Sequence, residues 1–199
     1  MPIGVCVAVK YYKDVINSIV DHPTMKYMEQ RNELDDLLDD LVTTGAETLQ
    51  AQGYQAIAQT CVEVDKKKEK HIPILPHKTV ATRAGVGWIG KCGLLVTEEY
   101  GSMIRISSIL TDAPLPTANP INQSRCDNCM EWKKHCPTKA IKGNLWAVGV
   151  PRDDLFDVDV CRKTSRELSQ LHLNKNISIC GKCIASCTYT KRYLQTVTP

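Results

Sequence analysis

Apolar residues recur every three or four positions between residues 24 and 52, and this spacing predicts one long amphipathic helix. Aspartates occupy the opposite side of this helix, and Gly53 follows as a stop signal. Alternating apolar residues predict strands over residues 5–9 and 54–60, with a short helix over residues 15–19 after the first strand. The order of strand, helix and strand is typical of a crossover unit in a layered sheet.

The next part of the chain is rich in glycine. A short helix is predicted over residues 77–84 and ends at Gly85, and residues 87–93 then hold three glycines. Such a loop lets the backbone approach another group closely. Residues 94–96 and 103–110 are predicted strands, and the short polar turn between them suggests a hairpin.

Three prolines mark a change in the character of the chain. Pro114, Pro116 and Pro120 stiffen a segment of low apolar content, which is typical of a linker. We therefore predict a sheet-and-helix domain of the α/β or α+β class over residues 1–120, followed by a cysteine-rich domain over residues 121–199.

Composition narrows the class of protein. The 199 residues are 43% hydrophobic and 24% charged, as in ordinary globular chains. The net charge of +3 is too small for a nucleic-acid footprint, and the basic run at residues 66–70 lacks aromatics and is interpreted as a solvated loop. No window approaches the ~18 apolar residues of a membrane span, and no basic region precedes the first apolar stretch. We expect a cytoplasmic protein with no membrane partner.

The cysteines carry the chemistry. Seven of the ten fall between residues 126 and 187 at short spacings. Disulfide scaffolds belong to small secreted chains, so such crowding in a reducing compartment indicates metal binding.

Two cysteine runs can be compared with bacterial ferredoxins, whose run is C-x2-C-x2-C-x3-C-P. Residues 126–137 keep the first, second and fourth cysteines and the proline, whereas Trp132 stands at the third position. Residues 180–187 give C-x2-C-x3-C, and a solitary Cys161 lies between the runs.

In two-cluster ferredoxins the last cysteine of a run binds the other cluster. This exchange predicts a ferredoxin-like module with two 4Fe-4S clusters. One cluster would be complete, with the ligands Cys136, Cys161, Cys180 and Cys183. The other would lack a fourth cysteine, with the ligands Cys126, Cys129 and Cys187.

Three interpretations account for the missing ligand. The iron at that position could be open, it could take a substitute such as His135, Cys92 or an external ligand, or the cluster could be lost or reduced to three irons. The remaining cysteines, Cys6, Cys61 and Cys92, otherwise fit buried thiols.

Structural zinc is the alternative to clusters. The pairs Cys126-x-x-Cys129 and Cys180-x-x-Cys183 could form a site of four thiolates, but zinc would leave three nearby cysteines unexplained. A thioredoxin-type redox pair fits less well, because neither pair follows a strand and opens a long helix.

A longer stretch resembles a known family. Residues 76–91 contain the string Arg-Ala-Gly-Val-Gly-Trp-Ile-Gly-Lys, and residues 94–102 and 110–116 continue the similarity. Together with the cysteine runs, this stretch resembles the epoxyqueuosine reductase family over roughly residues 70–195. The resemblance implies a cobalamin-binding α/β domain joined to a double-cubane module, in which the clusters pass electrons to cobalt and the reduced cofactor removes an epoxide oxygen from a modified tRNA base. Reductive dehalogenases share this layout.

The resemblance also implies functional residues. Those of the glycine-rich loop would lie against the cofactor, namely Arg83, Gly85, Gly87, Trp88, Gly90 and Lys91, although the glycines could instead only shape a turn. The acidic proton donor of the family falls near His71, and Asp65 is the nearest upstream aspartate. Histidine can donate a proton at neutral pH.

We therefore expect an iron-sulfur redox protein that moves electrons to cobalamin or directly to a small-molecule substrate. It is a candidate enzyme of the reductase class. The alternative is a non-catalytic electron carrier or redox-sensing module. A ferredoxin or flavodoxin is the expected electron donor. The short N-terminus and the absence of a helical-repeat tail after Pro199 argue against tRNA as a substrate.

Overall fold

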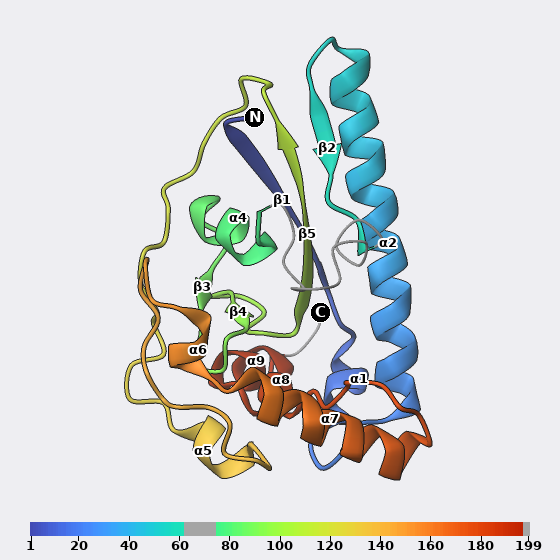
Figure 1. Cartoon of the computed structure of the whole chain (residues 1–199), viewed down its shortest axis with the longest axis vertical. Helices are drawn as coiled ribbons and strands as arrows, with labels where there is room; N and C mark the ends of the chain where they lie inside the picture. Colours follow the sequence, from blue (N-terminus) through green and yellow to red (C-terminus); the bar gives the residue numbers. More distant parts are fainter. Residues whose placement is uncertain (62–74, 197–199) are drawn as a thin grey trace. The chain divides into compact units, whose positions relative to one another are not determined.

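The computed structural model describes residues 1–61 and 75–196 of the chain. Figure 1 shows the elements in chain order: β1 (Ile3–Lys10), α1 (Lys13–Asn17), α2 (Met25–Ala51), β2 (Ala56–Ala58), α4 (His77–Arg83), β3 (Trp88–Ile89), β4 (Leu95–Val96), β5 (Ile104–Thr111), α5 (Glu131–His135), α6 (Arg152–Leu155), α7 (Val158–Leu173), α8 (Lys182–Ser186) and α9 (Thr188–Leu194). Helices are mixed with small antiparallel sheets, so the α+β part of the predicted fold class is confirmed.

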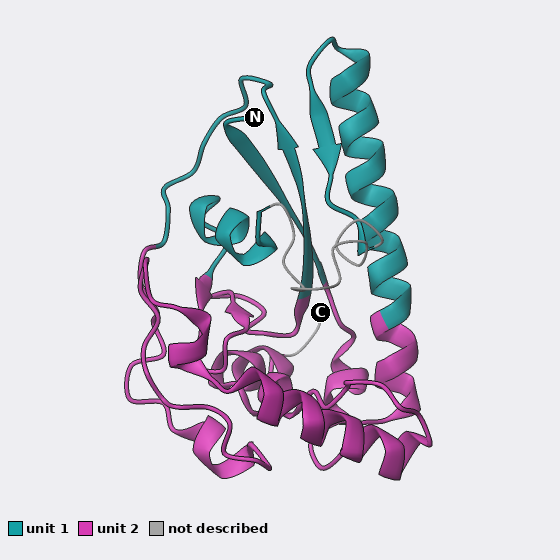
Figure 2. Ribbon diagram, in the orientation of Figure 1, with its two compact units in different colours: residues 1–9, 32–87, 105–121 teal, residues 10–31, 88–104, 122–199 magenta. Residues whose placement is uncertain are grey.

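Two compact units alternate along the chain (Figure 2). Unit 1 consists of residues 1–9, 32–87 and 105–121, and unit 2 of residues 10–31, 88–104 and 122–199. The chain enters unit 2 for the last time after residue 121, next to the predicted linker. Unit 2 also contains two earlier segments, residues 10–31 and 88–104. The assignment of a cofactor domain and a cluster domain to the two halves of the sequence stays a prediction.

A three-stranded sheet organises unit 1. Its order is β1-β5-β2, and β2 is antiparallel to β5 with Ala56 opposite Thr111. The predicted strands at both ends of the long helix are therefore present, and β5, which comes much later in the chain, lies between them.

The core of unit 1 forms between α2 and this sheet. Val42 and Ala46 of the helix pack against Ala56 and Ile109 of the strands. Gly45 allows the close approach, because a Cβ atom there would lie 2.6 Å from Cδ1 of Ile109. Burying each large apolar side chain contributes about 1.5–3 kcal/mol, so this contact holds the helix on the sheet.

Local sequence signals predicted several elements correctly. The long helix is confirmed as α2, and Gly53 follows it with a φ of 89°. The helix predicted over residues 77–84 is confirmed as α4, which is followed by Gly85 at a φ of 68°. A positive φ favours glycine, which explains both stop signals.

The predicted hairpin between β4 and β5 is wrong. Strand β4 pairs instead with β3, with Trp88 opposite Val96, while β5 belongs to the other sheet. The glycine-rich segment forms the turn between β3 and β4: the Gly90 amide donates to the Leu94 carbonyl at 2.8 Å, and Gly93 has a φ of 73°. The loop that the sequence suggested for close approach is thus itself a hairpin turn.

Helix α8 lies at the centre of unit 2, where it contacts α1, α5 and α9. It begins after Gly181, whose φ is 78° and whose Cβ, if present, would lie 2.5 Å from Cδ1 of Ile19. Ile184 and Ala185 are buried. The second cysteine run is therefore packed against a helix from the beginning of the chain.

Helix α9 is fixed at both ends. The Ser102 amide donates to Oγ1 of the buried Thr190 at 3.0 Å, and Lys10 Nζ donates to the Tyr193 hydroxyl at 2.7 Å. Because Cys187 directly precedes α9, these contacts also fix the position of that cysteine.

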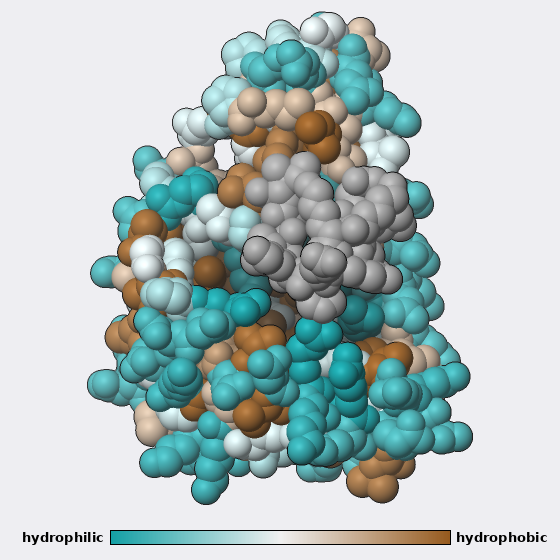
Figure 3. All heavy atoms as spheres, in the orientation of Figure 1, coloured by the Kyte–Doolittle hydropathy of each residue, from teal (hydrophilic) through white to brown (hydrophobic). Residues whose placement is uncertain are grey.

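In the view of Figure 3, the hydrophobic residues among those described form separate groups between hydrophilic ones. Within residues 1–61 and 75–196, no helix has both the length and the apolar character that a membrane crossing needs. The longest helix, α2, carries acidic residues along its length.

Candidate metal centre

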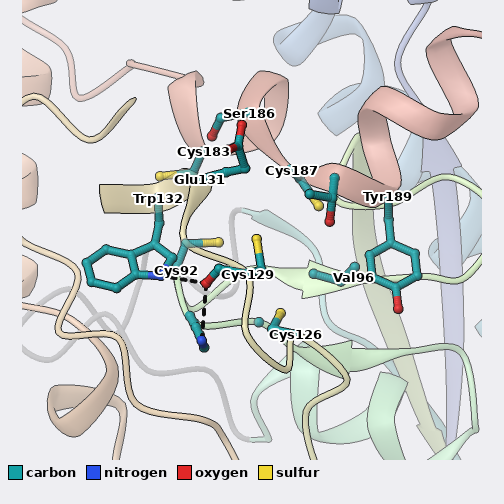
Figure 4. A pocket seen from close by; sticks show the side chains of 13 residues that line it. Cys92, Val96, Cys126, Cys129, Glu131, Trp132, Cys183, Ser186, Cys187 and Tyr189 are labelled. Atoms are coloured by element: carbon teal, nitrogen blue, oxygen red, sulfur yellow. Dashed lines mark hydrogen bonds between the residues drawn. The ribbon is translucent and has the colours of Figure 1, made fainter. Parts of the chain in front are cut away.

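Five cysteines of unit 2 line one cavity. They come from the β3–β4 turn, from the first cysteine run and from the second run: Cys92, Cys126, Cys129, Cys183 and Cys187. Figure 4 shows a shared space that is faced by the sulfur atoms of Cys92, Cys126, Cys129 and Cys187. The cavity has a volume of about 40 Å³ and is partly open to solvent, whereas a site for one water molecule needs about 10–15 Å³. It therefore has room for more than a single water molecule.

The first C-x2-C pair sits on a tight, well-anchored loop. The Cys129 amide donates to the Cys126 carbonyl at 2.8 Å, which closes the turn. Lys91 Nζ donates to the Asp127 carbonyl at 2.7 Å and to the Cys129 carbonyl at 3.2 Å. Trp132 Nε1 donates to the same Cys129 carbonyl at 3.1 Å. With the carbonyls of Asp127 and Cys129 bound in this way, both thiols of the loop line the cavity.

The third thiol comes from the junction of α8 and α9. Cys187 has extended backbone angles, φ −60° and ψ 129°, which interrupt the helix and turn the chain. Burial raises the pKa of the Cys187 thiol, and the charge of Cys92 adds to this rise. The three cysteines predicted for the incomplete cluster thus line a common cavity.

The four cysteines of the predicted complete cluster also influence one another. Burial raises the pKa of Cys161 and of Cys180, and the charge of Cys136 raises both further. A hydrogen bond with Cys92, followed by burial and by the charges of Cys136 and Cys180, raises the pKa of Cys183 well above its ordinary value.

Cys136 differs from the other thiols of its group. Burial alone would raise the pKa of Cys136, but hydrogen bonds with the Thr138 side chain and with the backbone of residues 138, 140 and 141 bring it below the ordinary value. These hydrogen bonds stabilise a thiolate, which is the form that binds metals. The ligand assignment itself stays a prediction.

The residues of the predicted cofactor loop are divided between the units. In unit 1, Arg83 Nη2 donates to the Ile121 carbonyl at 2.8 Å, and a Cβ at Gly85 would lie 2.7 Å from the Asn119 carbonyl oxygen. Gly87 is the last residue of this segment of unit 1.

The rest of the loop belongs to unit 2. The Trp88 ring is buried and meets the Tyr189 ring edge-on at 4.9 Å between centroids. A Cβ at Gly90 would lie 3.4 Å from the Cys126 sulfur. Gly90 and Lys91 both line the cysteine cavity. Gly90 thus faces a cysteine sulfur, and the contact of this loop with a cofactor stays a prediction.

Other predicted residues lie elsewhere. His71 and Asp65, the candidate proton donors, fall outside the described residues. Nδ1 of His135 hydrogen-bonds the Glu131 carbonyl at 2.9 Å, and His135 is not among the described residues around the cavity.

Among the described residues, no three or more His, Cys, Asp or Glu side chains are grouped as they would be around a single metal ion. The choice between a zinc site of four thiolates and cubane clusters therefore stays a prediction.

Comparisons with known proteins place the chain beside one group of reductases. No family model matches the sequence. The epoxyqueuosine reductase of Atelocyanobacterium thalassa is 32% identical over 120 residues, which are 60% of this chain and 39% of the relative. That of Escherichia coli K12 is 32% identical over 87 residues, or 44% and 23% of the two chains. That of Lactococcus garvieae is 40% identical over 65 residues, or 33% and 18%. The chain is epoxyqueuosine reductase-like.

The chain spans less than two fifths of the length of these relatives. Solved structures agree in fold. The reductive dehalogenase NpRdhA in complex with 3-bromo-4-hydroxybenzoic acid superposes with a TM-score of 0.73 at 17% identity, covering 94% of this chain and 25% of the other. An epoxyqueuosine reductase with a modified tRNA stem loop superposes with a TM-score of 0.53 at 19% identity, covering 94% and 48%.

The second of these neighbours is bound to a modified tRNA stem loop and shares the fold over 94% of this chain. At 19% identity this likeness concerns the fold alone. The expectation that tRNA is not a substrate stays a prediction.

Proposed function

We propose that the protein is an iron-sulfur redox protein of the epoxyqueuosine reductase-like type, in which two 4Fe-4S clusters carry electrons to a cofactor or substrate in a reductive reaction. The observation that carries the proposal is the cavity of unit 2, which cysteines from both runs line together. Such mixing of ligands between runs is the arrangement of two-cluster ferredoxins.

The donor set fits a cluster. All candidate ligands are thiols, which are the ligands of cubane clusters. Burial, and after it the charges of neighbouring thiols, raise the pKa of Cys161, Cys180 and Cys187, because both disfavour negative charge. A bound metal centre offsets this by supplying positive charge, and coordination deprotonates a thiol outright.

A bound 4Fe-4S cluster supplies one-electron transfer. The protein contributes the position and the surroundings of each cluster. Lys91 and Trp132 hold the loop of the first C-x2-C pair. Val96, Trp132 and Tyr189 line the cavity with apolar and aromatic surface, which limits the access of water.

The two cluster sites would be neighbours. Cys183, assigned to the complete cluster, lines the cavity of the other cluster. The charges of Cys136 and Cys180 contribute to the raised pKa of the same thiol. A short path between the clusters suits the passage of single electrons from a ferredoxin- or flavodoxin-type donor toward an acceptor.

The acceptor is proposed from the resemblance. Cobalamin is the candidate cofactor, because a further structural neighbour is a dehalogenase whose structure suggests a B12-dependent mechanism. Both tRNA and a small molecule are candidate substrates. The described residues of the glycine-rich loop contact the protein itself, as Arg83 does at Ile121 and Lys91 at the cysteine loop. The side chains of Arg83 and Lys91 are therefore already engaged within the protein.

These internal contacts favour a second candidate function, an electron carrier or redox-sensing module. Corrinoid uptake separates the two. A reconstituted protein that binds added hydroxocobalamin under reducing conditions supports the cofactor-dependent reductase, and a protein that takes up none supports the carrier.

The iron-sulfur proposal is tested by metal analysis of anaerobically purified and reconstituted protein. We expect a brown protein with broad visible absorption that dithionite bleaches, together with iron and acid-labile sulfide in equal amounts. Cys161→Ala should lower the iron content, whereas Cys6→Ala, a change in the other unit, should leave it unchanged. A colourless protein with stoichiometric zinc would overturn the proposal.

A further inference from the structure

The first cysteine run lacks one ligand. A 4Fe-4S cluster takes four thiolates, one for each iron. Cys126, Cys129 and Cys187 provide three at the cavity, and Trp132 stands where the third cysteine of the run would be.

Trp132 cannot fill this role. Its indole nitrogen is a donor only and is already used, since Nε1 donates to the Cys129 carbonyl. The ring is held against Gly143, where a Cβ would lie 2.6 Å from Cζ2 of the indole. Trp132 is therefore a wall of the cavity and a support of the cysteine loop.

Cys92 lies at the same cavity although it is far from both runs in sequence. It lines the cavity with the three cysteines, and its sulfur faces the space that they share (Figure 4). The fourth sulfur that the run lacks is thus present at the place where it is needed.

The backbone around Cys92 forms a hydrogen-bonded turn that is tied to the C-x2-C loop. The turn is closed by hydrogen bonds between Gly90 and Leu94 and between Gly93 and Gly90, each 2.8 Å long. Lys91, the residue before Cys92, binds the carbonyls of that loop. The two segments that carry Cys92 and the C-x2-C pair are therefore held together independently of any metal.

Cys92 also hydrogen-bonds Cys183, so it could in principle belong to the other cluster. That cluster already has four cysteines in the predicted scheme, and Cys92 would be a fifth. At the cavity, Cys92 would be the fourth cysteine. Because a 4Fe-4S cluster takes one thiolate for each iron, the number of cysteines favours the cluster at the cavity.

The other protein groups are less suitable. His135 is engaged with the Glu131 carbonyl and lies away from the cavity lining. Glu131 does line the cavity, but its carboxylate pairs with Lys191 at 2.6 Å and with Lys134 at 3.3 Å. Thiolate is also the softer ligand and the one that iron-sulfur clusters prefer.

We propose that Cys92 is the fourth thiolate ligand of the cluster at this cavity, an inference that rests on the proposed iron-sulfur function. The cysteine of the β3–β4 turn takes over the ligand position that Trp132 leaves without a thiol. The chain then holds eight cluster ligands in two sets of four.

The test compares wild type, Cys92→Ala and the matched control Cys6→Ala after anaerobic reconstitution with iron and sulfide. Wild type and control should bind about eight irons per chain. Cys92→Ala should lose about one iron, with the electron paramagnetic resonance signal of an oxidised three-iron cluster, or about four irons if the whole cluster is lost. Equal iron content and identical spectra in Cys92→Ala and wild type would overturn the inference.

Two further measurements distinguish the loss of a cluster ligand from a folding defect. Adding Trp132→Cys to Cys92→Ala should restore the iron content, because it returns a thiol to the third position of the run. In wild type alone, excess imidazole should leave the resonance spectrum of the reduced clusters unchanged, since every iron has a thiolate. An imidazole-induced shift in wild type would show an open iron and contradict the assignment.

A different result would contradict the proposed iron-sulfur function. If wild type takes up no iron and sulfide, the iron-sulfur function itself is wrong. If wild type binds two clusters that Cys92→Ala retains unchanged, only the role of Cys92 is wrong.

Discussion

Gly101 holds α9, and with it Cys187, in place, so its replacement offers a quantitative test of how the fold supports the candidate site. A Cβ at Gly101 would lie 2.1 Å from the Thr190 amide nitrogen and 2.7 Å from the Thr190 Cα. Both are backbone atoms, which cannot turn away as the end of a flexible side chain can. Gly101→Ala must therefore displace the first turn of α9.

The expected loss of stability has two parts. Gly101 has a φ of 60°, and an alanine in the left-handed region costs about 1–2 kcal/mol. Overpacking against atoms that cannot move adds about 1–3 kcal/mol. The sum of about 2–5 kcal/mol is a large part of the roughly 5–15 kcal/mol by which a typical domain is stable.

Gly149→Ala is the matched control. Gly149 also belongs to unit 2 and has a φ of 92°, but a Cβ there would meet nothing within 4 Å. It should show the backbone strain without the clash. The difference between the two variants isolates the contact with Thr190.

The assay is urea unfolding of the reconstituted proteins, followed by circular dichroism, with iron content measured on the same samples. Gly101→Ala should unfold at clearly lower urea than Gly149→Ala and should retain less iron, because Cys187 moves with α9. If the two variants unfold at the same urea concentration and hold the same iron, the close packing of Gly101 on α9 is wrong.

Three more predictions concern the cluster sites. Lys91→Met removes two hydrogen bonds from a charged donor, each worth about 1.5–3 kcal/mol, so iron should be lost faster to a chelator. Cys161→Ala should remove the cluster assigned to it, about four irons per chain, and leave the resonance signal of the other. Trp132→Cys alone should not raise the iron content, because Cys92 already completes the set.

Each of these has its own control and its own contradicting result. For Lys91→Met, the matched change is Lys182→Met, which removes a single exposed hydrogen bond to Asp21; equal rates of iron loss would argue against the anchoring role. For Cys161→Ala, unchanged iron would reject the ligand scheme. For Trp132→Cys, a clear gain of iron over wild type would show that the wild-type cluster is incomplete.

The sequence predicted elements that depend on local signals. The three-to-four spacing of apolar residues and the stop at Gly53 define α2, and both are properties of neighbouring residues. The partner of β4 could not be predicted in the same way. Strand pairing depends on contacts across the fold, and β4 has only two residues, Leu95 and Val96, to specify its partner.

The candidate site could likewise be predicted only in part from the sequence. The spacing within each run predicted which cysteines share a short loop, and the structure brings those of the incomplete set to one cavity. Cys92 could only be named as one substitute among several, because its approach to the site depends on the Lys91 contact with residues 127 and 129. The signal present in the sequence was a cysteine directly after the glycine-rich string, at a position that the spacing rules do not cover.

Mössbauer spectroscopy of the wild-type chain reconstituted with ⁵⁷Fe tests the central claim most directly. The account predicts about eight irons per chain, all in cubane clusters with tetrahedral sulfur coordination and none with a distinct non-sulfur ligand. A spectrum with one iron set apart by oxygen or nitrogen coordination would contradict the completion of the second cluster by Cys92. A chain that binds no cubane iron would contradict the iron-sulfur function as a whole.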